Sequence, residues 1–120
     1  MKDAAITADT TLLVLTHLPD ADSADALAAA LVGDQLAACV NILPACRSMY
    51  RWQGEIERIE EVPLIIKTTA ARYAALEAAI RARHPYELPE IVALPLQGLP
   101  DYLAWVARET GAEAAGTAPC

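Results

Sequence analysis

Runs of apolar residues with the length of strands alternate along the chain with segments of helical periodicity. The strand-like runs are nearly continuous, which is typical of strands covered on at least one face. One run is interrupted at Leu43-Pro44-Ala45, where we expect a bulge or bend because proline cannot donate to a ladder. The predicted strands are 11–18, 36–42 continuing as 46–52, 55–68 and 91–96.

Three further segments carry apolar residues every three to four positions and are predicted as helices. They are 20–32, 69–83 and 102–109. Asp20, Asp22 or Ser23 can cap the first helix by accepting a backbone N–H, and Gly33 is expected to end it. Pro85 ends the second, since proline disfavours the helical conformation of the residue before it.

The resulting order, βαββαβα, predicts a ferredoxin-like βαββαβ sandwich of the α+β class with an extra C-terminal helix. The helices are expected on one face of an antiparallel sheet. At 120 residues the chain has the length of one domain. We assign residues 1–110 to this domain and expect 111–120, which lack periodicity, to form a disordered tail.

The hairpin between the second and third strands is unusually long. Gln53-Gly54 is a turn signal between two strand patterns, and each arm approaches about 15 residues, beyond the usual strand length. Such arms overhang a domain of this size. Their tips would expose apolar side chains unless another subunit covers them, so the sequence predicts an oligomer. The residues concerned are Tyr50, Trp52, Ile56 and Ile59.

Composition narrows the possible partners and compartment. With 9 basic and 16 acidic residues, the net charge of −7 disfavours nucleic acids and anionic membranes. No apolar run approaches the roughly 20 residues that span a bilayer, and the start lacks the apolar core of a signal peptide. The three cysteines do not suggest a disulfide framework. We therefore expect a cytoplasmic protein.

The stiff link 84–90 carries the polar groups most suggestive of a binding site. His84 is followed by Tyr86, Glu87 and Glu90, between two prolines. Imidazole with carboxylate suits divalent copper or zinc, although a structural histidine at a subunit interface explains the same residues. His17 is expected to be structural and could approach His84 in the fold.

Other polar and aromatic residues are weaker site candidates. Glu61 and Lys67 are six apart and share one face of the returning strand. Trp52 and Tyr50 could stack on a ligand or be buried against a neighbouring subunit. No nucleophile and base are recognisable together, so we do not expect an enzyme.

Five segments, in this order and spacing, resemble the CutA family of divalent-cation-tolerance proteins: LAACVNILP, YRWQGEIE, IIKT, RHPYELPEI and YLAW. The similarity covers about residues 11–109 and implies a tight cyclic homotrimer whose long hairpins wrap neighbouring subunits. Trimeric PII signalling proteins, of similar architecture, bind small ligands in clefts between subunits. Family members are also known in interaction roles, so a protein partner is an alternative.

The resemblance further implies weak binding of Cu²⁺ in an intersubunit cleft. Members with an assigned copper site place a cysteine and two consecutive histidines at the positions of Thr16, Arg83 and His84, so only His84 is kept as a metal ligand here. For a small ligand in the cleft we expect contacts with Trp52, Glu61, Lys67, Tyr86 and Glu90.

Overall fold

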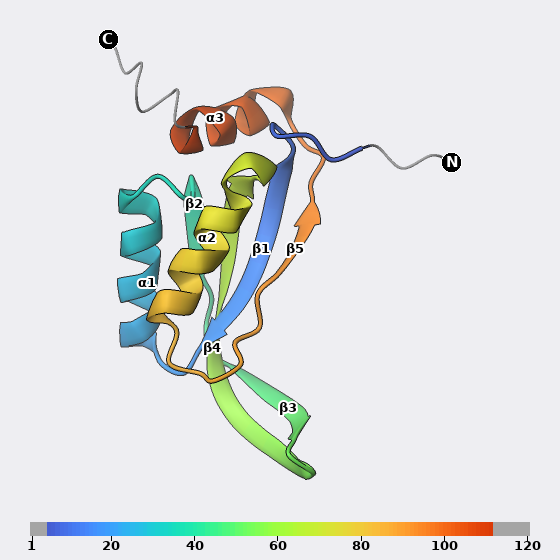
Figure 1. Ribbon diagram of the computed structural model, residues 1–120. Helices are drawn as coiled ribbons and strands as arrows, with labels where there is room; N and C mark the ends of the chain where they lie inside the picture. Colours follow the sequence, from blue (N-terminus) through green and yellow to red (C-terminus); the bar gives the residue numbers. More distant parts are fainter. Residues whose placement is uncertain (1–4, 112–120) are drawn as a thin grey trace.

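The computed structural model describes residues 5–111 and has the predicted ferredoxin-like α+β fold (Figure 1). The elements are β1 (Thr11–Leu18), α1 (Ala21–Gly33), β2 (Cys39–Ile42), β3 (Cys46–Trp52), β4 (Glu55–Thr69), α2 (Ala70–Arg83), β5 (Val92–Pro95) and α3 (Pro100–Thr110). All pairings are antiparallel, in the order β2-β4-β1-β5, with β3 also paired to β4. Apart from Gly111, the predicted tail lies outside the described residues.

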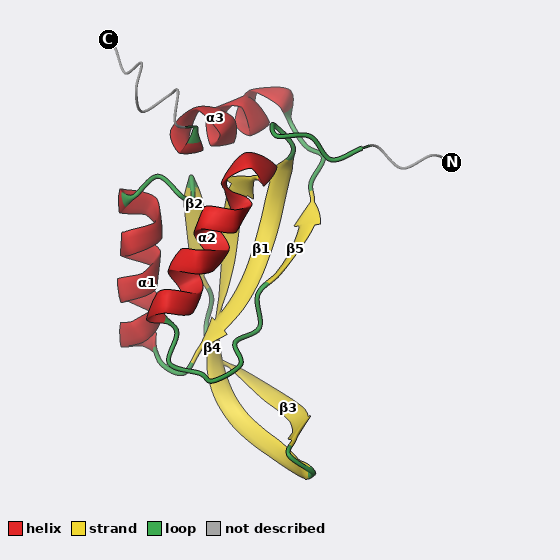
Figure 2. Cartoon of the chain, viewed as in Figure 1, coloured by secondary structure: helices red, strands yellow, loops and turns green. Residues whose placement is uncertain are grey.

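The core lies between one face of the sheet and the helices α1 and α2, which both cover that face (Figure 2). Along β1 the side chains alternate between buried and half-buried, as expected for a strand whose two faces differ. Leu12, Val14 and Leu18 of β1 pack in the same buried cluster as Leu31 of α1 and Leu76 of α2. Helix α3 lies across one end of the sheet (Figure 1).

The interruption at 43–45 is a bulge in the strand formed by β2 and β3. Ile42 pairs with Leu64 of β4, and Cys46 pairs with Glu61. Three residues separate Ile42 from Cys46, but only two separate Leu64 from Glu61, so one extra residue bulges out. Within this bulge the N–H of Leu43 donates to the carbonyl of Pro63. The nitrogen of Pro63 therefore faces the bulge, where no ladder bond is needed, as predicted.

The ends of the helices differ slightly from the prediction. Asp20 is the N-cap of α1, and its Oδ1 accepts from the N–H of Ser23 at 2.8 Å. The helix ends at Gly33, close to the predicted boundary, but Gly33 is not the residue with the left-handed conformation. The left-handed turn falls instead on Gln35 (φ 59°), whose conformation lets the next two N–H groups reach the carbonyl of Leu31. Helix α3 starts at Pro100, two residues before the predicted boundary.

The β3–β4 hairpin projects beyond the body of the molecule (Figure 1). The whole molecule, with the hairpin, measures 51 × 39 × 23 Å. Gln53 and Gly54 both have positive φ, which fits a two-residue turn of type I′. Tyr50 and Ile56 are exposed as predicted, whereas Trp52 and Ile59 are half-buried within the single chain. No helix among residues 5–111 is long and apolar enough to cross a membrane.

Candidate functional site

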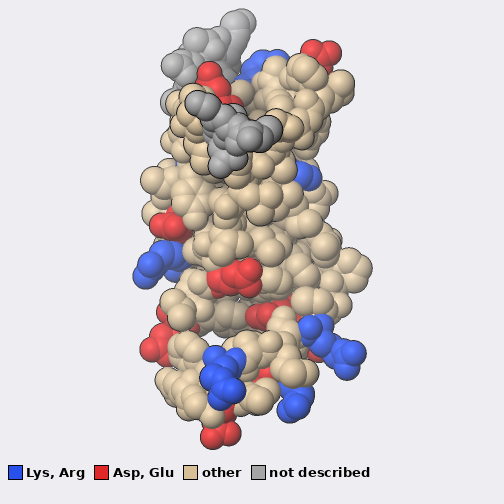
Figure 3. Space-filling view, turned by 90° about the vertical axis from the view of Figure 1, so that its right-hand side faces the viewer, with Lys and Arg blue, Asp and Glu red and all other residues tan. Residues whose placement is uncertain are grey.

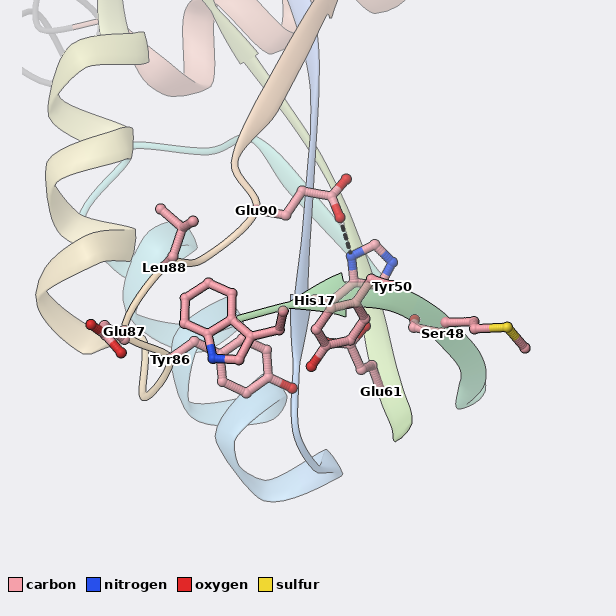
Figure 4. Close-up of a pocket in the computed structure, with 10 residues that line it drawn as sticks. His17, Ser48, Tyr50, Glu61, Tyr86, Glu87, Leu88 and Glu90 are labelled. Atoms are coloured by element: carbon pink, nitrogen blue, oxygen red, sulfur yellow. Dashed lines mark ion pairs between the residues drawn. The ribbon is translucent and has the colours of Figure 1, made fainter. Parts of the chain in front are cut away.

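A cavity of about 550 Å³ lies where the hairpin meets the end of β1 and the loop between α2 and β5 (Figure 4). Three parts of the chain that are distant in sequence line it: the end of β1, the β3–β4 hairpin and the loop between α2 and β5. Strand β1 contributes His17. The hairpin contributes Ser48, Met49, Tyr50 and Trp52 from β3 and Glu61 from β4. The loop contributes Tyr86, Glu87, Leu88 and Glu90.

His84 fixes the position of that loop. It is the C-cap of α2, has an extended backbone conformation, and is only 9% exposed. Its ring Nε2 lies 2.6 Å from the carbonyl oxygen of His17, and its Nδ1 accepts the N–H of Tyr86 at 3.2 Å. These partners require the neutral tautomer with hydrogen on Nε2, and burial lowers the pKa of His84 accordingly. Both ring nitrogens are thus engaged with backbone groups.

The carbonyl of His17 is available to His84 because β5 is short. The N–H of Leu96 donates to the carbonyl of Thr11, so the odd-numbered carbonyls of β1 point toward β5. However, β5 pairs only with Leu12–Leu15. The imidazole of His84 therefore takes the place of the next ladder donor beyond the end of β5, and ties the loop to β1.

His17 and Glu90 lie together on the wall of the cavity (Figure 4). His17 Nδ1 is 3.2 Å from Glu90 Oε1, at ion-pair distance but without the direction of a hydrogen bond. The side chain of His17 is 16% exposed and that of Glu90 is 48% exposed. This pair provides an imidazole nitrogen and a carboxylate oxygen at one point of the cavity.

Glu61 and Tyr86 form a more buried part of the same wall. Glu61 is 8% exposed, although it is a carboxylate on a hairpin strand. Burial raises the pKa of Tyr86, and the neighbouring Glu61 carboxylate raises it further. No hydrogen bond of good geometry reaches the buried Tyr86 hydroxyl among the described residues. The two side chains are therefore close without satisfying each other.

The structure brings together most of the predicted site residues. Trp52, Glu61, Tyr86 and Glu90 line the cavity, while His84 lies behind its wall. Lys67 does not reach it in this chain, since it bonds Asn41 on β2 and lies opposite Cys39.

Thr16 and Arg83, the two other positions that correspond to copper ligands in the family that the sequence resembles, also lie outside the cavity wall. Thr16 is fully buried on the core face of β1, and Arg83 is exposed at the end of α2.

Several lining residues were not singled out from the sequence. His17 was expected to be structural, and Ser48, Met49 and Leu88 were not considered as ligand contacts. Alternation along β1 puts His17 on the sheet face away from the helices, which is a signal available from sequence. That this face meets the loop depends on the register between β1 and β4.

The donors for a metal ion are sparse within one chain. Among residues 5–111 no three or more His, Cys, Asp or Glu side chains gather closely enough to hold an ion. Among the lining residues, His17 and Glu90 are the close pair that provides a nitrogen and an oxygen donor of the kind copper or zinc accepts. The cavity therefore fits a weakly held ion or one completed by other ligands.

Comparison with known proteins gives consistent matches over most of the chain. The family model for the CutA1 divalent ion tolerance protein matches residues 12–109. The divalent-cation tolerance protein CutA of Thermus thermophilus is 46% identical over 100 residues, covering 82% of this chain and 97% of that protein. Its counterpart in an Escherichia coli O45:K1 strain is 38% identical over 107 residues, covering 88% of this chain and 96% of that protein.

Solved structures agree in fold as well as sequence. CutA from Xylella fastidiosa superimposes with a TM-score of 0.82 at 43% identity, covering 84% of this chain and 98% of that one. The periplasmic divalent cation tolerance protein CutA of Archaeoglobus fulgidus gives a TM-score of 0.80 at 32% identity, covering 83% and 98% respectively.

Proposed function

Because the chain belongs to the CutA1 divalent ion tolerance family, we propose that it serves divalent-cation tolerance by binding such an ion weakly in the cavity beside its hairpin. Cu²⁺ is the first candidate. The observation that supports this proposal is the 3.2 Å approach of His17 Nδ1 to Glu90 Oε1 on the cavity wall. Imidazole and carboxylate together suit copper or zinc.

His17 is a better ligand than His84 in this arrangement. A metal ligand needs a free nitrogen lone pair, and His84 uses Nδ1 to accept from Tyr86 and Nε2 to donate to His17. His84 could bind an ion only if its ring gave up one of these bonds. We therefore propose His17 and Glu90 as the ligands and His84 as the residue that holds the loop.

Self-association would complete this site. One chain offers two adjacent donors, fewer than a tight site requires, and the hairpin beside them projects from the body with exposed apolar residues. We propose a homotrimer in which a neighbouring subunit closes the cavity. We propose binding rather than catalysis as the role of this cavity. The cytoplasmic location stays a prediction.

A second candidate function is the binding of a small organic ligand without a metal. The cavity volume of about 550 Å³ falls within the range of roughly 300–1,000 Å³ that is usual for small-molecule sites. Aromatic side chains from two parts of the chain line it, which a site for a bare ion does not need. A trimer that presents a rigid surface to a protein partner is the remaining alternative.

Calorimetric titration of chelator-treated protein with Cu²⁺ tests the metal proposal. We expect His17→Ala to weaken copper binding at least tenfold and His84→Gln to retain it, with circular dichroism checking that both variants fold. If His17→Ala bound copper as tightly as the parent, the proposed site would be wrong. Loss confined to the His84 variant would assign the ion to that ring instead.

A further inference from the structure

The charged groups that line the cavity are almost all of one sign. Glu61, Glu87 and Glu90 are carboxylates, and no lysine or arginine is among the lining residues within 5–111. The one basic group is His17, which already lies beside Glu90. Figure 3 shows acidic side chains beside the hollow between the body and the hairpin, with basic side chains farther out around it. Such a wall attracts cations and repels small anions.

Glu61 is the most buried of the three carboxylates that line the cavity. It is 8% exposed, whereas its neighbour Glu60 on the opposite face of β4 is exposed. Within the described part of the chain no Lys, Arg or His lies within ion-pair distance of Glu61. Burial of an unpaired carboxylate is costly, and a cation in the cavity would offset that cost.

Three aromatic rings line the cavity together with this carboxylate. Tyr50 and Trp52 extend from β3, and Tyr86 extends from the loop that His84 anchors. Figure 4 shows the phenol rings of Tyr50 and Tyr86 projecting into the same space beside Glu61. The faces of such rings attract ammonium groups, and their area accommodates an apolar body. A bare metal ion would use neither property.

We propose that the cavity binds a small organic cation, a protonated primary amine with an apolar or aromatic body. The ammonium group pairs with the carboxylate of Glu61, and the body lies among Tyr50, Trp52 and Tyr86. This inference rests on the proposal above that the cavity is the binding site, and it names the class of ligand. It does not require the His17–Glu90 metal site to be occupied.

Three probes of nearly equal shape and different charge test this proposal. They are 2-phenylethylamine, 2-phenylethanol and phenylacetate, titrated calorimetrically at pH 7.5 into the full chain after treatment with a chelator. The amine is protonated at this pH. We expect the amine to bind at least tenfold more tightly than the alcohol, and phenylacetate to bind most weakly. Equal affinity for all three probes, or binding of none, would overturn the proposal.

A matched pair of variants locates the charge that is responsible. Glu61→Gln keeps the shape of the side chain and should weaken amine binding at least tenfold, bringing it close to the alcohol. Glu60→Gln removes the same charge one residue away, outside the cavity, and should change the affinity less than twofold. Equal effects of the two substitutions would show a general charge effect and contradict a specific site.

The outcomes separate this inference from the metal proposal. If the amine binds after chelator treatment and the parent protein does not bind Cu²⁺, the organic-ligand proposal is supported and the metal proposal is refuted. Copper binding that depends on His17, together with no selectivity for the amine, would support the ion and refute the organic ligand.

Discussion

At the scale of single residues, His84 acts as a connector between the helix α2, the strand β1 and the cavity loop. Its Nε2 takes the place of the ladder donor that the short strand β5 does not supply to His17, and its Nδ1 accepts the N–H of Tyr86. Only the neutral ring can make both bonds, because the protonated form has no acceptor for the N–H of Tyr86. The stability of the loop is thus coupled to the protonation of one buried side chain.

The free energy of unfolding should therefore decrease as the pH is lowered below the pKa of a free histidine. Burial lowers the folded-state pKa of His84 below the usual value of about 6.5, so the unfolded chain takes up the proton first. The contribution of neutral His84 is complete above about pH 6.5 and is lost as the pH falls toward the lowered folded-state pKa. Urea unfolding at fixed protein concentration, between pH 7.5 and 5, measures this slope.

The variant His84→Gln serves as the reference for that measurement. Glutamine can donate to the His17 carbonyl but does not titrate, so its urea midpoint should depend less on pH across the same interval. Identical pH slopes for parent and variant would show that His84 is not the group responsible.

At the scale of elements, the hairpin and the bulge beside it determine where the cavity forms. The bulge at 43–45 shifts the register between β2 and β3 on β4, and so sets which residues of β3 face the loop. Pro63 has its missing donor at the bulge, where the ladder is already broken. The turn at Gln53-Gly54 then keeps both arms paired to their ends.

The conformation of this turn predicts opposite effects for two substitutions. Gly54 has φ 83°, and an alanine there would be strained by about 1–2 kcal/mol. Gln53 also has positive φ (52°), a conformation that asparagine tolerates better than glutamine. Chemical unfolding should show Gly54→Ala destabilised by about 1 kcal/mol or more, and Gln53→Asn unchanged or slightly stabilised. A neutral Gly54→Ala would contradict the turn described here.

At the scale of the whole molecule, the hairpin and the outer face of the sheet are two places where the single chain exposes apolar side chains. On the hairpin, Met49 is 66% exposed and Ile56 is 54% exposed. On the sheet face away from α1 and α2, Val92 and Leu94 of β5 are exposed opposite Leu15 and Leu13 of β1. Each of these areas groups several exposed apolar side chains, so we propose them as the contacts for further copies of the chain.

Light scattering at micromolar concentration should accordingly give a mass well above the 12.8 kDa of one chain, about three times that value for a trimer. A charge on the hairpin, Ile56→Glu, should shift the mass toward the monomer. The same change at Val32, which is 43% exposed on α1, should leave the mass unaltered. A monomeric parent would refute the association inferred from the hairpin.

The sequence by itself determined the order of the elements, the fold class, the long hairpin and the family. The order, the class and the hairpin follow from periodicity, prolines and turn residues, which act locally and can be read one segment at a time. The family follows from the resemblance of five segments to known members. It also indicated Trp52, Glu61, Tyr86 and Glu90 as residues that share a site, and all four line the cavity.

Only the tertiary structure decided which histidine faces the cavity and which is committed to the backbone. Lys67 was grouped with Glu61 because both side chains share one face of a strand. They lie six residues apart on an extended strand, however, and Lys67 donates to Asn41 instead of reaching the cavity. His17 was taken as structural, yet the register of β1 on β4 and the early end of β5 expose its ring and give its carbonyl to His84. Register and strand length depend on contacts between distant segments, which no local pattern specifies.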